Sequence, residues 1–248
     1  MKTDSAMWSN LSSVVCRSSP FGNETGKLPM GVFEPKTTDT LSVLSQTKVL
    51  VIGAGGLGCE ILKDLALSGF RDITVIDLDT IDLSNLNRQF LFRKKDVGRS
   101  KAEVASEFIN NRVKGCNVKW FMDKIQSFDE LFYRQFRIIV CGLDNLEARR
   151  WLNAKIVSMV DHDEDGEINP DTVIPLIDGG TEGLRGQARV IIPKITACFE
   201  CTIADFPPQL TFQICTIGTN KVHTISVLSL FHHHIETDQT QYEHENNS

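Results

Sequence analysis

Val49-Leu-Val-Ile-Gly53-Ala-Gly55-Gly56-Leu-Gly58 is the stretch that decides the fold of this 248-residue chain. Four apolar residues followed by glycines in the spacing G-x-G-x-x-G predict a buried strand that turns tightly into a helix. Gly53, Gly55 and Gly58 have no Cβ, so the backbone can turn sharply and its N–H groups can approach a phosphate at the positive helix N-terminus. The stretch therefore predicts a nucleotide-binding loop.

A second strand with an acidic end follows this loop. The predicted helix extends from Cys59 to Ser68, stops at Gly69 and leads to the strand Ile73-Thr-Val-Ile-Asp77. Asp77 can accept hydrogen bonds from ribose hydroxyls at the carboxyl end of that strand. These features alone are also typical of a dehydrogenase that binds a dinucleotide, and glycine-rich turns also occur for packing reasons.

The next residues favour a triphosphate over a hydride-transfer cofactor. Beyond Asp77 the chain places a second acid, two amides and an arginine in the run that ends at Arg88 and Gln89. A hydride-transfer cofactor needs no such cluster. The planar fork of Arg88 suits the oxygens of a triphosphate.

Taken together, these motifs resemble the ThiF/MoeB-type adenylation domain of ubiquitin-like-protein activating enzymes. The resemblance is carried by Gly-Ala-Gly-Gly-Leu-Gly, Asp-x-Asp-x-x-x-x-Ser-Asn-Leu-Asn-Arg-Gln, Gly98-Arg-Ser-Lys101-Ala and Cys141-Gly-Leu-Asp144-Asn, in that order. The resemblance covers roughly residues 18–217. Within the family, the sequence is most similar to the catalytic subunit of the heterodimeric activating enzyme of the neddylation pathway.

The resemblance implies an acid–thiol ligase that uses ATP and Mg²⁺. Its reaction is adenylation of the C-terminal glycine of a ubiquitin-like modifier of the neddylation pathway, followed in full-length members by thioester formation on a cysteine. It implies three partners: a regulatory subunit that forms a heterodimer, the modifier, and in full-length members a conjugating enzyme. Full-length members also bind zinc.

The resemblance also assigns site residues. The nucleotide site comprises Gly53, Gly55, Gly56, Gly58, Asp77, Asp79, Asn85, Arg88, Gln89, Lys101 and Asp144. The catalytic group comprises Cys215, Arg88 and Lys101, with Asp144 as the Mg²⁺ ligand. Without the resemblance, an aspartate at position 144 is more often the N-cap of the next helix, predicted from Leu146 to Val160. Lys101 lies in the first turn of its own predicted helix, where its charge opposes the helix dipole, and this disfavours a purely structural role.

Three cysteines have alternative interpretations. Cys198 and Cys201 form a C-x-x-C that matches half of the family's zinc site, and a redox pair is the alternative. Cys215 matches the thioester cysteine, although a small buried hydrophobe is what its isoleucine and threonine neighbours alone would favour. The flanks of Cys215 and the histidine-containing tail depart from the family, as in a truncated or alternatively spliced form.

The predicted fold class is α/β: a doubly wound, mostly parallel sheet with a Rossmann-like nucleotide-binding half and an incomplete C-terminal part. Further strands are expected at Asn117–Phe121 and Arg137–Cys141, with a helix from Phe128 to Phe136 between them. We expect an N-terminal arm at 1–45, the adenylation domain at 46–205, and the start of a catalytic-cysteine segment with a divergent tail at 206–248.

Composition is consistent with a cytoplasmic and nuclear enzyme. The net charge of −6 argues against nucleic acid as a partner, and the chain has no long apolar run for a membrane and no secretory signal. Seven cysteines, an odd number, suggest a reducing compartment. The acidic run Asp161–Ile168 partly matches a calcium loop, but Thr172 stands where the bidentate Glu is needed, so a solvated loop is favoured.

Two further functions stay open at this point. A sulfur-carrier adenylyltransferase shares the nucleotide motifs. A non-catalytic competitor would bind the partner or the modifier without turnover.

Overall fold

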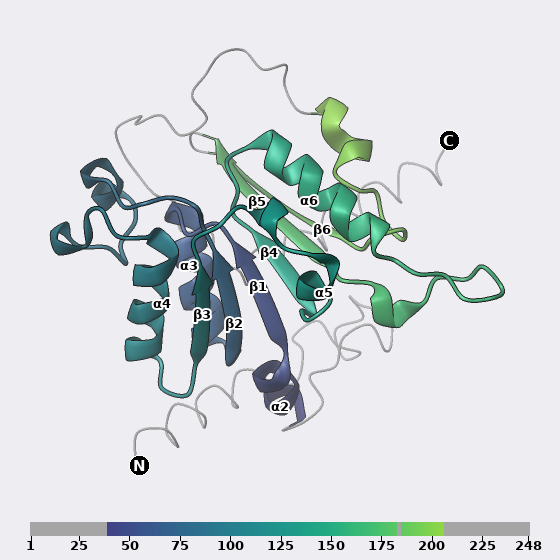
Figure 1. Ribbon diagram of the computed structural model, residues 1–248, viewed down its shortest axis with the longest axis horizontal. Helices are drawn as coiled ribbons and strands as arrows, with labels where there is room; N and C mark the ends of the chain where they lie inside the picture. Colours follow the sequence, from purple (N-terminus) through teal and green to yellow (C-terminus); the bar gives the residue numbers. More distant parts are fainter. Residues whose placement is uncertain (1–38, 183–184, 206–248) are drawn as a thin grey trace, which may run out of the picture.

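A computed structural model describes residues 39–182 and 185–205, and within these ranges the chain folds around one six-stranded sheet (Figure 1). The strand order is β3-β2-β1-β4-β5-β6; neighbours are parallel except β6, which is antiparallel to β5. This arrangement confirms the predicted doubly wound, mostly parallel α/β fold. The strands are β1 Lys48–Ile52, β2 Asp72–Ile76, β3 Asn117–Phe121, β4 Ile138–Cys141, β5 Leu176–Glu182 and β6 Arg185–Ile191.

Helices connect the strands. The α-helices are α2 Asp39–Gln46, α3 Gly56–Leu67, α4 Lys101–Arg112, α5 Glu130–Tyr133 and α6 Leu146–Ser158. Short 3₁₀ helices are η1 Leu83–Asn87, η2 Lys94–Asp96, η3 Ile125–Ser127, η4 Pro170–Thr172 and η5 Glu200–Asp205. No helix among the described residues is both long and apolar enough to cross a membrane.

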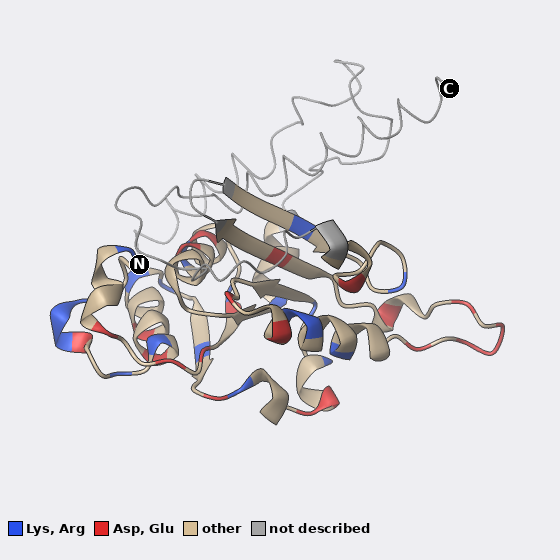
Figure 2. Ribbon diagram, turned by 90° about the horizontal axis from the view of Figure 1, so that it is seen from above, with Lys and Arg blue, Asp and Glu red and all other residues tan. Residues whose placement is uncertain are grey.

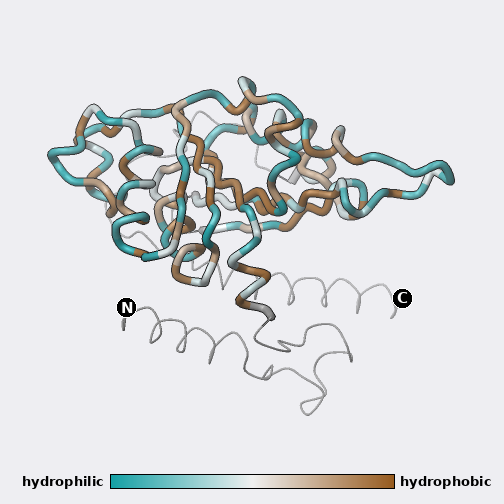
Figure 3. The backbone as a smooth tube through the Cα atoms, turned by 60° about the horizontal axis from the view of Figure 1, so that its bottom comes forward, coloured by the Kyte–Doolittle hydropathy of each residue, from teal (hydrophilic) through white to brown (hydrophobic). Residues whose placement is uncertain are grey.

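Side chains of the central strands alternate between two apolar layers. Val49 and Val51 of β1 pack in a cluster with residues of α3 and α4. Leu50 and Ile52 belong to a second cluster with residues of α5 and α6. This alternation follows from the two-residue period of a strand, and because both faces are covered the strand is apolar throughout. In Figure 3 the strands at the centre of the molecule are largely brown.

The register of the three central strands places their carboxyl ends at one edge. Ile52 of β1 is level with Ile76 of β2 and with Cys141 of β4. Strands β2 and β3 lie on one side of β1, and the chain then crosses to β4 on the other side, so the strand order reverses between β1 and β4. Ligands of such sheets bind at this topological switch point, outside the carboxyl ends.

The expected helix from Phe128 to Phe136 was too long. The structure has η3, then the single turn of α5 with Asp129 as its N-cap, whose carboxylate accepts from the Phe132 N–H (2.8 Å). The four-residue spacing of the phenylalanines instead builds an aromatic cluster in which Phe128 and Phe132 stack at 4.2 Å. The aromatic contacts override the helical periodicity.

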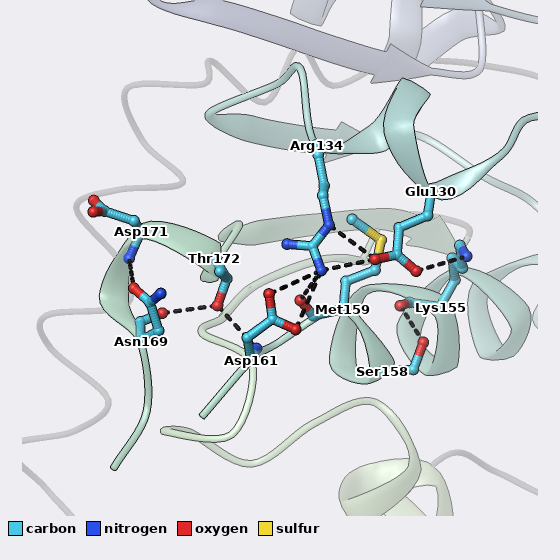
Figure 4. A network of polar contacts seen from close by, with 9 residues as sticks. All are labelled: Glu130, Arg134, Lys155, Ser158, Met159, Asp161, Asn169, Asp171 and Thr172. Carbon is cyan, nitrogen blue, oxygen red and sulfur yellow. Dashed lines mark hydrogen bonds and ion pairs between the residues drawn. The ribbon is translucent and has the colours of Figure 1, made fainter. Parts of the chain in front are cut away.

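Arg134 ties the segment after α5 to α6 and to the loop behind it (Figure 4). Its guanidinium pairs with Glu130 (2.7 Å) and Asp161 (3.1 Å) and donates to the Met159 carbonyl (2.9 Å). Lys155 of α6 adds a longer pair to Glu130 (3.6 Å). These contacts lie at the amino-terminal edge of β4, away from the nucleotide loop.

The acidic run 161–168 forms a projecting hairpin (Figure 2). His162 bridges to Ile168, and Asp163 Oδ1 accepts from the N–H groups of Asp165 and Glu167 at 3.0 and 2.8 Å. One carboxylate is thus used to close the turn. Among the described residues no cluster of three or more potential metal ligands occurs.

Candidate functional site

The glycine loop is shaped by contacts that leave no room for side chains. Gly53 has φ +97°, and a Cβ there would lie 2.7 Å from the Gly142 carbonyl oxygen at the end of β4. A Cβ on Gly58 would lie 2.0 Å from the Gly53 oxygen. Gly55 is the N-cap of α3 and provides no side-chain cap, so no side chain occupies the N–H groups of the first turn. This cradle fits a phosphate group.

Two acids follow the end of β2, beside the cradle. Asp77 accepts from the N–H of Ala54 (2.5 Å) and from its neighbour Asp79 (2.8 Å), so it holds the loop in place. Burial raises the pKa of Asp77, while these hydrogen bonds and the Lys101 ammonium act in the opposite direction. Each carboxylate oxygen keeps a lone pair for a ribose hydroxyl.

Lys101 is buried and aimed at this edge. It is the first residue of α4, is 7% exposed, and its Nζ pairs with Asp79 Oδ2 at 2.6 Å. Ser100 is the N-cap of this helix, since its hydroxyl accepts from the Glu103 N–H (3.4 Å). Asp79 thus offsets the unfavourable position of a cation at a helix N-terminus.

The 3₁₀ turn η1 carries the next group of predicted residues. Asn85 is buried, and its side-chain oxygen accepts from the Asp82 N–H (3.0 Å), which closes the turn. Arg88 caps the turn and donates to the Ser84 carbonyl (3.2 Å), with no ion pair among the described residues. Gln89 is 3% exposed, and its Oε1 has no described hydrogen-bond partner. Gln89 Nε2 lies 4.0 Å from the Cβ position of Gly55.

Asp144 follows β4 at the same edge. It is exposed and makes no described hydrogen bond or ion pair. The neighbouring Asn145, not Asp144, is the N-cap of α6, since its side-chain oxygen accepts from Glu147 N (2.7 Å) and Ala148 N (3.2 Å). The N-cap interpretation of Asp144 is therefore wrong, which leaves its carboxylate free for a ligand.

Of the five described cysteines, two are buried, Cys116 is half-buried, and the two of the C-x-x-C lie near the surface. Cys59 and Cys141 are buried, and burial raises the pKa of both thiols, which disfavours their nucleophilic thiolate form. Cys198 and Cys201 lie near the surface with their sulfurs 3.6 Å apart. Burial opposes ionisation of Cys198, but hydrogen bonds from the Cys201 backbone and from Asn153 lower its pKa overall. Cys215 lies outside the described residues.

Arg149 and Asp178 form a buried ion pair that sequence analysis did not single out. Arg149 Nη1 lies 3.3 Å from Asp178 Oδ2, and the two side chains are 9% and 4% exposed. Arg149 is three residues after Leu146 and three before Leu152, so helical periodicity alone would have placed it on the buried face of α6. Its partners depend on tertiary structure.

The residues present fit a magnesium nucleotide better than they fit zinc. The side-chain-free cradle, the unpaired Gln89 oxygen and the free Asp144 carboxylate surround one edge, and Mg²⁺ needs only one or two carboxylates besides phosphate oxygens. A structural zinc site needs four ligands, and the described residues supply only the two thiols of Cys198 and Cys201. Their sulfurs are 3.6 Å apart, close to the distance of about 3.8 Å between two sulfurs that bind one tetrahedral zinc.

Fold and site together define a nucleotide-binding α/β domain with a phosphate cradle at the β1/β4 switch point. The chain belongs to the ThiF family, whose model matches residues 30–233.

Named relatives and solved structures agree with this. The "NEDD8-activating enzyme E1 catalytic subunit" of Dictyostelium discoideum is 57% identical over 215 residues, 85% of this chain and 47% of the relative. The protein of the same name from Drosophila melanogaster is 61% identical over 175 residues, 70% of this chain and 39% of the relative. Escherichia coli MccB, solved with ATP, has a TM-score of 0.54 at 28% identity and covers 65% of this chain and 45% of its own. The chain thus spans less than half the length of these relatives.

Proposed function

We propose that this chain is the adenylating part of an enzyme that activates a ubiquitin-like modifier of the NEDD8 type. The observation that carries the proposal is the convergence of the glycine cradle, Lys101 and the unpaired Asp144 at one edge of the sheet. The relatives named for NEDD8 activation and the MccB structure with ATP support the choice of substrates. A regulatory subunit would complete the enzyme as a heterodimer.

In the proposed reaction the C-terminal carboxylate of the modifier attacks the α-phosphorus of ATP. The new P–O bond forms as the bond to the leaving pyrophosphate breaks, and an acyl-adenylate results. The N–H groups of the α3 N-terminus and the charges of Arg88 and Lys101 stabilise the developing negative charge. Mg²⁺ held by Asp144 would neutralise phosphate charge.

Two later features of the family are also part of the proposal. The Cys215 thiolate, a good nucleophile near neutral pH, would attack the acyl carbon of the adenylate, so that the thioester C–S bond forms as the bond to AMP breaks and AMP leaves. Cys198 and Cys201 would supply two of the four ligands of a structural zinc. Their loop is already attached to α6, because Phe199 N–H donates to Asn153 (3.0 Å) and Glu200 pairs with Arg150 (2.6 Å).

ATP–pyrophosphate exchange tests the adenylation step. The chain, combined with its partner subunit and the modifier, should catalyse exchange, and Asp144→Ala should abolish it with an unchanged melting temperature, since the exposed Asp144 makes no hydrogen bond or ion pair with the described residues. Asp165→Ala, which removes another exposed aspartate in the distant hairpin, is the matched control and should exchange normally. Absence of exchange in the unaltered protein would favour a non-catalytic competitor. Normal exchange in Asp144→Ala would remove Asp144 from the metal site.

A further inference from the structure

Arg149 joins three segments at the carboxyl edge of the sheet. It lies in the first turn of α6, and its Nη2 donates to the Leu143 carbonyl of the β4–α6 loop and to the Gly179 carbonyl of β5 (3.0 Å). Its Nη1 pairs with Asp178 Oδ2 (3.3 Å). One planar guanidinium thus links the loop after β4 to the glycine-containing end of β5.

The surrounding backbone is built to accept this side chain. A Cβ on Gly180 would lie 3.0 Å from Nη2 and 3.3 Å from Nη1 of Arg149. Glycine at this position therefore makes room for the guanidinium. A Cβ on the preceding Gly179 would lie 3.2 Å from Cδ2 of Leu57, which belongs to the phosphate cradle.

A contribution to stability does not explain the buried ion pair between Arg149 and Asp178. Burial raises the pKa of Asp178 even though Arg149 and Arg189 favour its charged form. Arg149 Nε and Asp178 Oδ1 are buried with no described hydrogen-bond partner. An incompletely satisfied buried ion pair contributes little net stability compared with apolar residues of the same size. Its position next to the metal-binding loop suggests a different role.

We infer that Arg149 is a positioning residue for the metal site. Leu143, whose carbonyl it holds, directly precedes Asp144, so the guanidinium fixes the loop that presents the Asp144 carboxylate. The same side chain holds Gly179 and Asp178 of β5, and it thereby couples the loop of Asp144 to the end of that strand. The inference rests on the proposed function.

Calorimetric titration of the full chain with ATP, with Mg²⁺ and separately with EDTA, tests this role. Arg149→Lys keeps the charge but cannot reach all three acceptors in one plane. We expect it to weaken ATP binding in Mg²⁺ by about tenfold, the usual scale for losing a group that orients a metal ligand. Binding in EDTA should change by less than about twofold, because the phosphate cradle does not depend on Asp144. Arg150→Lys, its exposed neighbour on α6, is the matched control and should match the unaltered chain in both buffers.

A double-mutant cycle separates positioning from general damage. In an Asp144→Asn background, Arg149→Lys should add almost nothing to the loss in Mg²⁺, because the residue through which it acts has gone. Gly180→Ala provides a second route, since the added methyl group displaces the guanidinium without altering it, and should show the same Mg²⁺-specific loss. This variant answers the question if Arg149→Lys does not fold.

The possible outcomes are distinct. Equal weakening of ATP binding with and without Mg²⁺, additive effects in the Asp144→Asn background, or unchanged binding in both Arg149→Lys and Gly180→Ala would each overturn the positioning role. An unaltered chain that binds no ATP under either condition would instead overturn the proposed function, and this inference with it.

Discussion

Among single residues, Gly58 shows most directly how the fold and the site depend on the same atoms. A Cβ at position 58 would overlap the Gly53 oxygen at 2.0 Å, whereas a Cβ at position 55 would meet only Gln89 Nε2, at 4.0 Å. Gly58 is needed for helix α3 to pack against the end of β1. Gly55 lies at the N-cap, where a phosphate would approach the backbone.

The two glycines should therefore respond differently to alanine. Gly58→Ala should lower the free energy of unfolding by about 1–3 kcal/mol, the usual cost of overpacking, and should also abolish ATP binding. Gly55→Ala should fold normally and lose most of its ATP affinity. Chemical denaturation and ATP titration of both variants check this. Normal stability in Gly58→Ala would contradict the contact that the structure gives.

Not every residue of the site could be foreseen from the sequence. The glycine loop and Asp77 follow from strand ends and spacing, whereas Lys101 and Asp144 were predicted only from the family resemblance; the structure places the ends of β1, β2 and β4, which these residues follow or approach, at one edge. Arg149 was missed because its partners are backbone carbonyls and an aspartate from distant parts of the chain. Contacts of this kind have no sequence spacing that reveals them.

At the scale of elements, the strands were predicted better than the connections. Asn117–Phe121 was predicted to the residue, as a short run with β-branched and aromatic residues that starts two residues after Gly115. The segment from 128 to 136 was predicted as a helix, yet its α-helical part is the single turn of α5, and Phe128 and Phe132 pack edge-to-face against Phe121. Short segments depend more on their tertiary neighbours than on their own periodicity.

The attachment of α5 to α6 gives a prediction with a pH dependence. Arg134→Met removes the contacts of the guanidinium to Glu130, Asp161 and the Met159 carbonyl, and should lower the melting temperature by about 2–4 °C at pH 7. The hydrogen bond from Arg134 lowers the pKa of Glu130 in the folded state. A lowered pKa stabilises the fold above the ordinary glutamate pKa, about 4.3, and this contribution is lost as the pH falls through the folded value.

The difference in melting temperature between the unaltered chain and Arg134→Met should therefore shrink below about pH 4. Arg137→Met is the control, since Arg137 is exposed and has no ion pair among residues 39–182 and 185–205. If this difference in melting temperature instead grew as the pH fell, the ion pair with Glu130 would not be the source of the stabilisation by Arg134.

Strand β6 carries a residue that we expect to select the modifier. Arg189 is level with Asp178 of β5, and its guanidinium lies 5.6 Å from the centre of the Phe199 ring and donates to Thr202. If the modifier tail lies along this strand, Arg189 repels a modifier with an arginine at the matching position. Arg189→Gln should then accept ubiquitin in competition with the NEDD8-type modifier.

The contact of Arg189 with the C-x-x-C segment requires a control for that prediction. Arg150→Gln loosens the same segment by removing the Glu200 ion pair, without altering β6. It should leave the preference between modifiers unchanged. An Arg189→Gln variant with unaltered preference would end the selection hypothesis.

For the whole molecule, the site lies where two apolar layers meet. The cluster that contains α3 and α4 and the cluster that contains α5 and α6 cover opposite faces of one sheet. The phosphate cradle touches the first, and the loop of Asp144 connects to the second through Gly142, whose N–H donates to Ile52 (2.9 Å). A ligand bound at this junction contacts both halves of the fold.

Mg²⁺-ATP should consequently stabilise the entire domain rather than a local loop. At a free concentration of about 100 Kd, mass action adds about 2.7 kcal/mol, which corresponds to about 5–10 °C for a domain of this size. Calorimetry should show one transition that moves upward as a whole. NAD should produce no shift, because the acid and arginine cluster after β2 suits a triphosphate. A shift with NAD and none with ATP would instead support the dehydrogenase hypothesis, and two transitions of which only one moves would show that the ligand contacts a single half.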